Sequence, residues 1–305
     1  MRRTGGGPAG PTTRIDGILL LDKPGGMSSN AALQRVKRAL GADKAGHTGS
    51  LDPMATGMLP LCLGEATKVA GLLLGARKCY FAHVRLGTTT TTLDADGAVL
   101  EQRAVPPLDD GALRELLARY TGSITQRPPA YSAIKRDGVP LYRLARQGIA
   151  VEAPLREVVI ESIELLARDT ETFAIRVVCG SGTYIRSLAA DIGEALGCGA
   201  HLVALRRAWV DPFGDAAMLD LDSIEAAPDA ARERLLPLEA GVAGRPRVDF
   251  AAGEAAAIAH GIAQAPAGLD WTGPGCAFGP DGHLVALVER SADGVVRARR
   301  VLVRP

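Results

Sequence analysis

Every second side chain is apolar from Tyr80 to Leu86, and the positions between them include His83 and Arg85. This alternation with a period of two residues predicts a strand over residues 79–86 that is buried on at least one face. Similar alternating or apolar runs, bounded by turn-forming residues, predict further strands at residues 15–21, 156–165, 172–179 and 202–210.

Elsewhere apolar residues recur every three or four positions, which predicts helices. In the first of them Val36 and Leu40 share a face, Ser28 or Ser29 can cap the start, and Gly41 can end the helix. Strands and helices are interspersed without strict alternation, so the sequence predicts an α+β fold with a mixed sheet. The other expected helices are at about residues 65–74, 109–120, 184–196, 220–240 and 252–260.

The chain has 305 residues, enough for about two domains. Residues 1–13 are rich in Gly, Pro and Thr, and we expect a flexible tail there. We expect a main domain over residues 14–245 and a small domain over 246–305 with a short helix and two or three strands. A Gly/Arg/Pro cluster at 241–247 would link them. Residues 121–155 are turn-rich, basic and dotted with aromatic residues, which is typical of a functional loop.

The composition excludes several classes of protein. No run approaches 18 apolar residues, so we expect no membrane span, and the N-terminal residues contain no apolar core of a signal peptide. The five cysteines show no CxxC spacing, which favours reduced thiols and argues against a zinc site. We therefore expect a cytoplasmic protein that holds no metal.

The net charge of +1 is an average over unequal segments. Residues 1–90 carry 12 basic and 5 acidic side chains, and residues 127–147 carry 5 and 1. Because local fields steer polyanions, two basic blocks in an otherwise acidic or neutral chain are compatible with a nucleic-acid partner. Chance clustering on a solvated surface is the alternative.

Familiar cofactor patterns are absent from the sequence. The run VVCGSG at 177–182 resembles the start of a dinucleotide fingerprint, but Ile185 stands where a small residue is needed. There is no P-loop, HExxH, GxSxG or EF-hand pattern, and close carboxylate pairs of a conventional glycosidase are hard to find. We therefore expect no cofactor.

The most unusual stretch is GHTGSLDPMATG, at residues 46–57. Its three glycines favour a tight backbone, and Pro53 keeps Asp52 out of a helix interior. Asp52 is flanked by apolar residues and is the only acidic residue between 44 and 64, so it is a candidate catalytic carboxylate. The alternative is an aspartate in an Asx-turn, preceded by an ordinary surface histidine at position 47.

Three segments resemble the TruB family of tRNA pseudouridine synthases. They are LLLDKPGGMSSN, AGHTGSLDPMATGMLPLCLGEATK and GTYIRSLAADIGEALGCGAHLVALRR, in consistent order from about residue 19 to 209. The resemblance implies a mixed-sheet pseudouridine-synthase catalytic domain followed by a small PUA-like β domain at 246–305. It also implies a monomer that isomerises uridine 55 in the T-loop of tRNA, without a cofactor.

The resemblance implies roles for individual residues. Asp52 would start cleavage of the uridine C1′–N1 bond, after which the base rotates and C5 re-forms the bond to C1′. Attack on the sugar, attack on the base and removal of a sugar proton all stay open for this carboxylate. Arg186 in GTYIR would pair with Asp52, and Tyr80 would contact the base near C5.

Other implied roles concern the surroundings of the reacting nucleotide. Tyr184 and Leu205 would line the base pocket. His47 would contact the RNA loop and help to occupy the space that the extruded base leaves, and Lys23 with Pro24 would pack near the site. An enzyme that acts on this bond must take the nucleotide out of its stack.

An RNA-embracing loop is implied at about residues 128–152. Its RNA-contact candidates are Lys135, Arg143 and Arg146. Two competing functions are an RNA-binding module without catalysis and an N-glycosidase that releases free uracil.

The family usually carries Thr-Asp-Thr in the segment that here contains a run of five threonines. Thr91 stands where that aspartate is expected. Arg186 would then rest on Asp52 alone or on another acceptor, and Asp94 or Asp96 could compensate.

Overall fold

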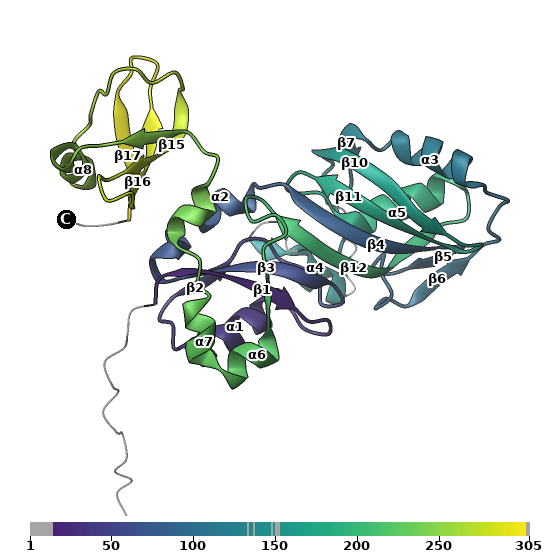
Figure 1. Ribbon diagram of the computed structural model, residues 1–305. Helices are drawn as coiled ribbons and strands as arrows, with labels where there is room; N and C mark the ends of the chain where they lie inside the picture. Colours follow the sequence, from purple (N-terminus) through teal and green to yellow (C-terminus); the bar gives the residue numbers. More distant parts are fainter. Residues whose placement is uncertain (1–14, 133, 137, 148, 150–152, 303–305) are drawn as a thin grey trace, which may run out of the picture.

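The computed structural model describes residues 15–132, 134–136, 138–147, 149 and 153–302. These residues form one large and one small β-sheet with helices packed beside them (Figure 1). The expected tail at 1–13 lies outside the described residues.

The large sheet has nine strands within the described chain, and it is mixed. Neighbouring strands run antiparallel except in the β1–β13 and β3–β12 pairs, which are parallel. The strand order is β13 (Leu219–Asp220), β1 (Gly17–Lys23), β3 (Thr56–Leu63), β12 (Ala200–Val210), β4 (Lys78–Leu86), β11 (Thr172–Cys179), β10 (Arg156–Arg168) and β7 (Gly122–Gln126), with β2 (Ala45–His47) paired to β3.

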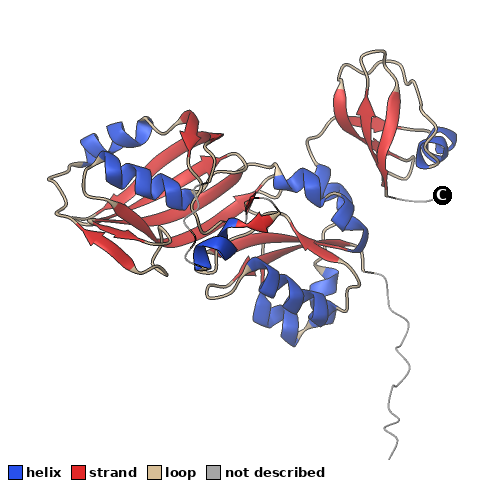
Figure 2. Cartoon of the chain, turned by 180° about the vertical axis from the view of Figure 1, so that it is seen from behind, coloured by secondary structure: helices blue, strands red, loops and turns tan. Residues whose placement is uncertain are grey.

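Helices cover parts of both halves of this sheet (Figure 2). The helices of the described residues are α1 (Ser29–Leu40), the 3₁₀ helix η1 (Gly64–Lys68), α2 (Ala70–Leu74), α3 (Asp110–Ala118), α4 (Leu141–Arg146), α5 (Ile185–Ala195), α6 (Leu221–Ala226), α7 (Pro228–Glu233), the 3₁₀ helix η2 (Leu238–Val242) and α8 (Ala252–Ala259).

The half built from β13, β1 and β3 packs against α1, α6 and α7. The Ser28 side chain caps α1 by accepting a hydrogen bond from the Ala31 N–H (3.1 Å), and Gly41 ends the helix at φ 68°. Val36 and Leu40 are fully buried, as their spacing predicts. Leu19 and Leu21 of β1 meet them in one core, because alternate residues of a strand share a face.

The other half, from β12 to β7, packs against α3 and α5. The alternation that predicts β4 is confirmed, because Tyr80, Ala82, Val84 and Leu86 are buried while the residues between them are exposed. This apolar face meets Leu188 of α5 in one core cluster.

The two halves meet where β3 and β12 run side by side for two residue pairs, one of which is Gly57 with Arg207. Gly57 has φ 100°, and a β-carbon there would lie 2.2 Å from the Arg207 carbonyl oxygen. Only glycine allows this approach.

The small sheet follows the main domain. Lys68 Nζ donates to the Val301 carbonyl oxygen (3.0 Å), and the Leu284 N–H donates to Glu239 Oε1 (2.8 Å), which ties this sheet to the main domain. Its order is β14 (Arg247–Asp249), β15 (Gly273–Phe278), β16 (Leu284–Arg290) and β17 (Val296–Val301), one strand more than the largest number expected from sequence.

Strand β3 does not follow from the sequence patterns. All its residues from Gly57 to Leu63 are buried, so no alternation marks it, and Pro60 in its centre argues against a strand. Residues 65–74 form η1 and α2 instead of one helix. The fully buried Val69 stands between them, where η1 ends and α2 begins. Residues 220–240 form three short helices, since Pro228 has no N–H and starts a new one.

The segment expected as a loop contains short regular elements. After β7 come β8 (Lys135–Arg136) and β9 (Val139–Pro140), which pair as a hairpin, and then α4. A second hairpin pairs β5 (Thr88–Thr90) with β6 (Val99–Gln102). Elements this short give too little periodicity to be read from sequence.

Candidate active site

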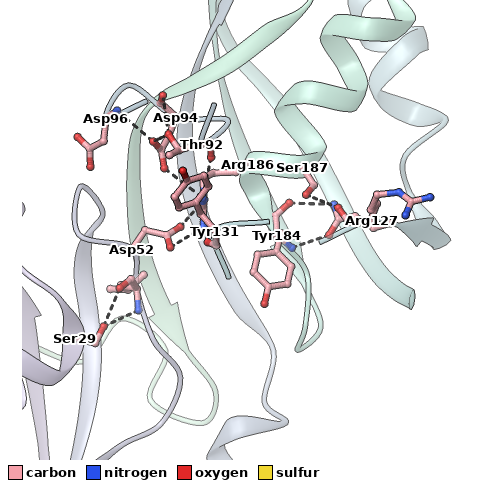
Figure 3. Close-up of polar contacts among 12 residues, drawn as sticks. Ser29, Asp52, Thr92, Asp94, Asp96, Arg127, Tyr131, Tyr184, Arg186 and Ser187 are labelled. Carbon is pink, nitrogen blue, oxygen red and sulfur yellow. Dashed lines mark hydrogen bonds and ion pairs between the residues drawn. The ribbon is translucent and has the colours of Figure 1, made fainter. Parts of the chain in front are cut away.

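Asp52 lies in the loop between β2 and β3, and hydrogen bonds fix the backbone on both sides of it (Figure 3). The Ser29 hydroxyl accepts a hydrogen bond from the Leu51 N–H (2.7 Å) and donates one to the Leu51 carbonyl oxygen (3.0 Å). The Ala55 N–H donates to the Asp52 carbonyl oxygen (3.1 Å). Ser29 is 2% exposed, so α1 holds the Asp52 loop through a contact shielded from water.

Lys23 supports the same loop from the end of β1. Its Nζ donates to the carbonyl oxygens of Pro24 (2.7 Å), Met27 (2.7 Å) and Pro53 (3.3 Å). Burial lowers the pKa of Lys23 to about 8, while the nearby Asp52 acts to raise it. The KPGG turn and the Asp52 loop are therefore joined through one buried ammonium group.

Arg186 reaches Asp52 from the first turn of α5 (Figure 3). Its Nη2 donates to Asp52 Oδ1 (2.9 Å), and its Nε lies 2.8 Å from Oδ2, an ionic contact without hydrogen-bond geometry. The guanidinium also donates to the carbonyl oxygens of Thr92 (2.8 Å) and Tyr131 (3.0 Å). The Arg186 side chain is 3% exposed and that of Asp52 34%, so the carboxylate is the accessible partner.

A second carboxylate holds Arg186. Asp94 Oδ2 lies 3.5 Å from Arg186 Nη1, and the Asp94 side chain is 6% exposed. The Thr92 hydroxyl and the Asp96 N–H donate to Asp94 Oδ1. Leu93 in this turn has φ 62°, the one positive φ outside glycine among the described residues, a conformation that clusters at functional sites.

This turn also explains why a threonine can stand at position 91, where the resemblance leads us to expect an aspartate. The Thr91 hydroxyl accepts a hydrogen bond from the Ala98 N–H (3.1 Å), and the Thr91 N–H donates to the Ala98 carbonyl oxygen (2.9 Å), which closes the β5–β6 hairpin. Asp94 supplies the second carboxylate for Arg186, one of the two compensations that the sequence leaves open. Asp96 contributes its backbone N–H to Asp94.

Apolar and aromatic side chains surround the ion pair. Tyr80 and Leu205, on the adjacent strands β4 and β12, are 7% and 8% exposed and share a core cluster with Leu51. Gln126 fixes Tyr184, since its Oε1 accepts from the Tyr184 N–H (2.8 Å) and its Nε2 donates to the Tyr184 carbonyl oxygen (3.0 Å). Tyr184 stands directly before α5, two residues before Arg186 (Figure 3).

Arg207 is a buried cation that sequence reasoning misses. It is 1% exposed and donates from Nε to the carbonyl oxygen of Met58 in β3 (2.7 Å) and from Nη2 to that of Gly49 in the Asp52 loop (3.0 Å). The signal for it is its place two residues after Leu205, on the same strand face.

His47 of β2 is half-buried, and its Nδ1 is buried without a hydrogen-bond partner among the described residues. Burial, and then the charge of Arg207, lower the pKa of His47. The imidazole is therefore neutral near pH 7.

Opposed influences act on the pKa of Asp52. Burial raises the pKa of Asp52, Arg186 acts to lower it, and Asp94 acts to raise it. The result is a carboxylate on a fixed backbone, held at both oxygens by a guanidinium, with its side chain 34% exposed. Such a group can act as a nucleophile or as a base.

Comparison with known proteins decides the family. Residues 37–185 match the model of the TruB family pseudouridylate synthase N-terminal domain, and residues 186–243 match that of the tRNA pseudouridylate synthase B C-terminal domain. The chain belongs to the TruB family of pseudouridylate synthases. As a TruB family member it is an isomerase.

Curated relatives are similar over nearly the whole chain. The protein named tRNA pseudouridine synthase B from Xanthomonas euvesicatoria is 51% identical over 290 residues, 94% of each chain. The protein of that name from Xylella fastidiosa is 53% identical over 291 residues, which are 94% of this chain and 96% of the other.

Solved structures confirm the α+β mixed-sheet fold with its small C-terminal sheet. A chain of an H/ACA RNP bound to a substrate RNA containing 2′-deoxyuridine superposes with a TM-score of 0.75 and 26% identity. A chain of a Cbf5-Nop10-Gar1 complex gives 0.74 and 28%. In both cases the match covers 94% of this chain and 85% of the other.

The structure brings most of the expected TruB site residues together and leaves others apart. Asp52, Arg186, Tyr80, Tyr184 and Leu205 share one site, and their roles stay predictions. Lys23, Pro24 and His47 belong to the supporting loop and strands described above. Arg143 is exposed on α4, and the side chains of Lys135 and Arg146 lie outside the described residues.

The described part of this TruB chain shows no group of three or more His, Cys, Asp or Glu side chains that could hold a metal ion. Among the described helices, none has the length and apolarity to cross a membrane. All five cysteines are buried and free.

Proposed function

We propose that this TruB family member converts uridine 55 in the T-loop of tRNA to pseudouridine, with Asp52 as the catalytic carboxylate. The observation that carries the proposal is the two-point contact of Arg186 with Asp52 in a site walled by Tyr80, Tyr184 and Leu205. The name tRNA pseudouridine synthase B on relatives that match 94% of this chain supports tRNA as the substrate.

The reaction balances without a cofactor. The C1′–N1 bond breaks, the uracil rotates within the site, and a C1′–C5 bond forms. The hydrogen on C5 leaves as a proton, and N1 gains a proton. Asp52 acts in its ionised form, whether as nucleophile or as base, and Arg186 stabilises that form while fixing the direction of both oxygens.

The target uridine must leave its stack to reach Asp52. The ring of Tyr80 and the apolar Leu205 replace base-stacking partners for the extruded uracil, and Tyr184 closes the pocket from the start of α5. His47, neutral at pH 7, contacts the RNA loop without adding charge at the carboxylate. This division leaves phosphate recognition to arginines and lysines farther out, including Arg143 in the RNA-embracing loop.

The test of the proposal is Asp52→Asn. We expect loss of pseudouridine formation by at least about 10⁴-fold, because the amide can neither attack nor accept a proton, and little change in tRNA affinity. The assay is tritium release from tRNA labelled at uridine C5. Asp43→Asn, an exposed aspartate in the same basic block, is the control and should keep the wild-type rate. Turnover near the wild-type rate in Asp52→Asn would remove Asp52 from the chemistry.

The substrate position needs its own measurement. Mass spectrometry of a modified tRNA mixture should locate pseudouridine at position 55 of the T-loop. Release of free uracil would identify an N-glycosidase instead. Tight binding with no product in a single-turnover incubation would identify an RNA-binding module.

A further inference from the structure

Arg156 stands beside the base pocket and has no part in the roles assigned so far. It is the first residue of β10 and pairs with Gln126 of β7, the residue that fixes the Tyr184 backbone. A β-carbon on Gly182 would lie 3.8 Å from Arg156 Nη1. The guanidinium therefore lies next to the Gly-Ser-Gly turn that leads into Tyr184 and α5.

The Arg156 guanidinium has no acceptor among the described residues. Within the part of the chain that the structure describes, no ion pair and no hydrogen bond of this guanidinium is formed, and its Nε is buried without a partner. The two buried arginines of the site differ from Arg156 in this respect. Arg186 and Arg207 each donate hydrogen bonds to at least two described acceptors. A half-buried guanidinium without an anion beside a substrate pocket is equipped for an anion from the substrate.

Tyr184 connects this arginine to the catalytic pair. Burial raises the pKa of the Tyr184 hydroxyl, and Arg156 exerts the largest opposing influence, while Asp52 and Arg186 also act on it. The hydroxyl is thus within electrostatic reach of Arg156 and of the Asp52–Arg186 pair. A nucleotide with its sugar at Asp52 and its base against Tyr184 brings its own backbone within reach of this region.

We propose that Arg156 binds a phosphate group of the RNA strand next to the target nucleotide. This rests on the proposed function, which supplies RNA as the ligand. The planar fork of a guanidinium matches two phosphate oxygens, whereas an uncharged sugar or base edge would leave its charge unpaired. Binding there would hold the backbone on one side of the flipped uridine while Asp52 acts on its sugar–base bond.

The salt dependence of binding tests the charge. With a T-arm stem-loop RNA, Arg156→Gln should reduce the steepness of log K against log salt by about 0.7, the value for one phosphate on a single strand. Arg156→Lys should keep the wild-type slope. Arg119→Gln, an exposed arginine at the end of α3, is the matched control and should keep it too.

Neutral phosphates test the contact itself. We would prepare a series of stem-loops, each with a single methylphosphonate at a different position flanking the target uridine. One of them should bind the wild-type protein about tenfold more weakly, while its affinity for Arg156→Gln is unchanged. The proposal is overturned if each methylphosphonate lowers the RNA affinity of both proteins equally. It is also overturned if Arg156→Gln slows product formation while the salt slope is unchanged, since that result assigns Arg156 to positioning Tyr184. Tritium release by the wild-type protein on the same RNA separates this failure from failure of the proposed function.

Discussion

The two sides of the candidate active site use buried cations differently. On the loop side, Lys23 of β1 and Arg207 of β12 donate to backbone carbonyl oxygens in and around the Asp52 loop. On the side of α5, Arg186 contacts the carboxylates of Asp52 and Asp94. The first arrangement fixes the course of a loop, and the second fixes the direction and charge of the Asp52 carboxylate.

The difference has an energetic origin. A buried ammonium that faces carbonyl dipoles has little to offset its loss of hydration, and the pKa of Lys23 falls to about 8. For a guanidinium between two carboxylates, the opposite charges as well as the hydrogen bonds offset the free-energy cost of lost hydration. Substitutions on the loop side should therefore act mainly on stability and geometry, and substitutions on the α5 side should act on the chemical step.

The same change on both sides gives the largest expected contrast. Arg186→Lys should slow pseudouridine formation about 10³-fold, because one ammonium nitrogen cannot reach both Asp52 oxygens and the two carbonyl oxygens together. Arg207→Lys should lower the melting temperature more than the rate. Single-turnover tritium release and thermal unfolding measure the two effects, and equal rate losses in both variants would erase the distinction between the sides.

Asp94→Asn should give the next largest effect. The amide keeps an acceptor but loses the charge 3.5 Å from Arg186, and a guanidinium displaced from Asp52 should cost on the order of 10²-fold in rate. Thr91→Asp, which introduces the carboxylate usual in the family at a position engaged in the β5–β6 hairpin, should leave the rate near wild type. A stronger effect from Thr91→Asp than from Asp94→Asn would show that Asp94 does not hold Arg186.

Sequence patterns predict the parts of this site that sit on regular elements. Tyr80 lies on a strand whose buried and exposed residues alternate. Arg186 lies in the first turn of a helix with a clear apolar face, so periodicity places both residues. Asp52 is found from the glycines and the proline around it. The family resemblance then brings these separate segments to one place, which no local pattern could do.

The parts that escape prediction depend on tertiary contacts. Strand β3 is buried on both faces and contains Pro60, so it carries no periodic signal. Nothing local distinguishes Asp94 from Asp96, because the choice rests on a turn with Leu93 at φ 62°. Ser29 reads as a possible helix cap in the sequence, whereas Ser28 is the cap and Ser29 binds Leu51 across the fold.

The adjacent serines allow a matched test of the loop side. Ser29→Ala removes both hydrogen bonds to Leu51 and should lower kcat about tenfold, because Asp52 is the next residue and depends on that anchor for its position. Ser28→Ala removes the cap of α1 and should cost about 1 kcal/mol of stability with kcat unchanged. An unchanged kcat in Ser29→Ala would mean that Lys23 and Arg207 suffice to hold the loop.

The smallest expected effect is a shift of the pH profile, and it connects the two sides. In the proposed reaction Asp52 acts in its ionised form, so the rate should fall as the pH drops through the pKa of Asp52, which burial and Asp94 both act to raise above the ordinary value of about 3.9. Asp94→Asn removes the second of these influences. Its acid limb should therefore move to lower pH, even though its maximal rate is lower. Single-turnover rates of both proteins across the acid range measure this shift. An acid limb that moves to higher pH instead would mean that Asp94 acts on Asp52 mainly by keeping Arg186 in contact with it, and not through its own charge.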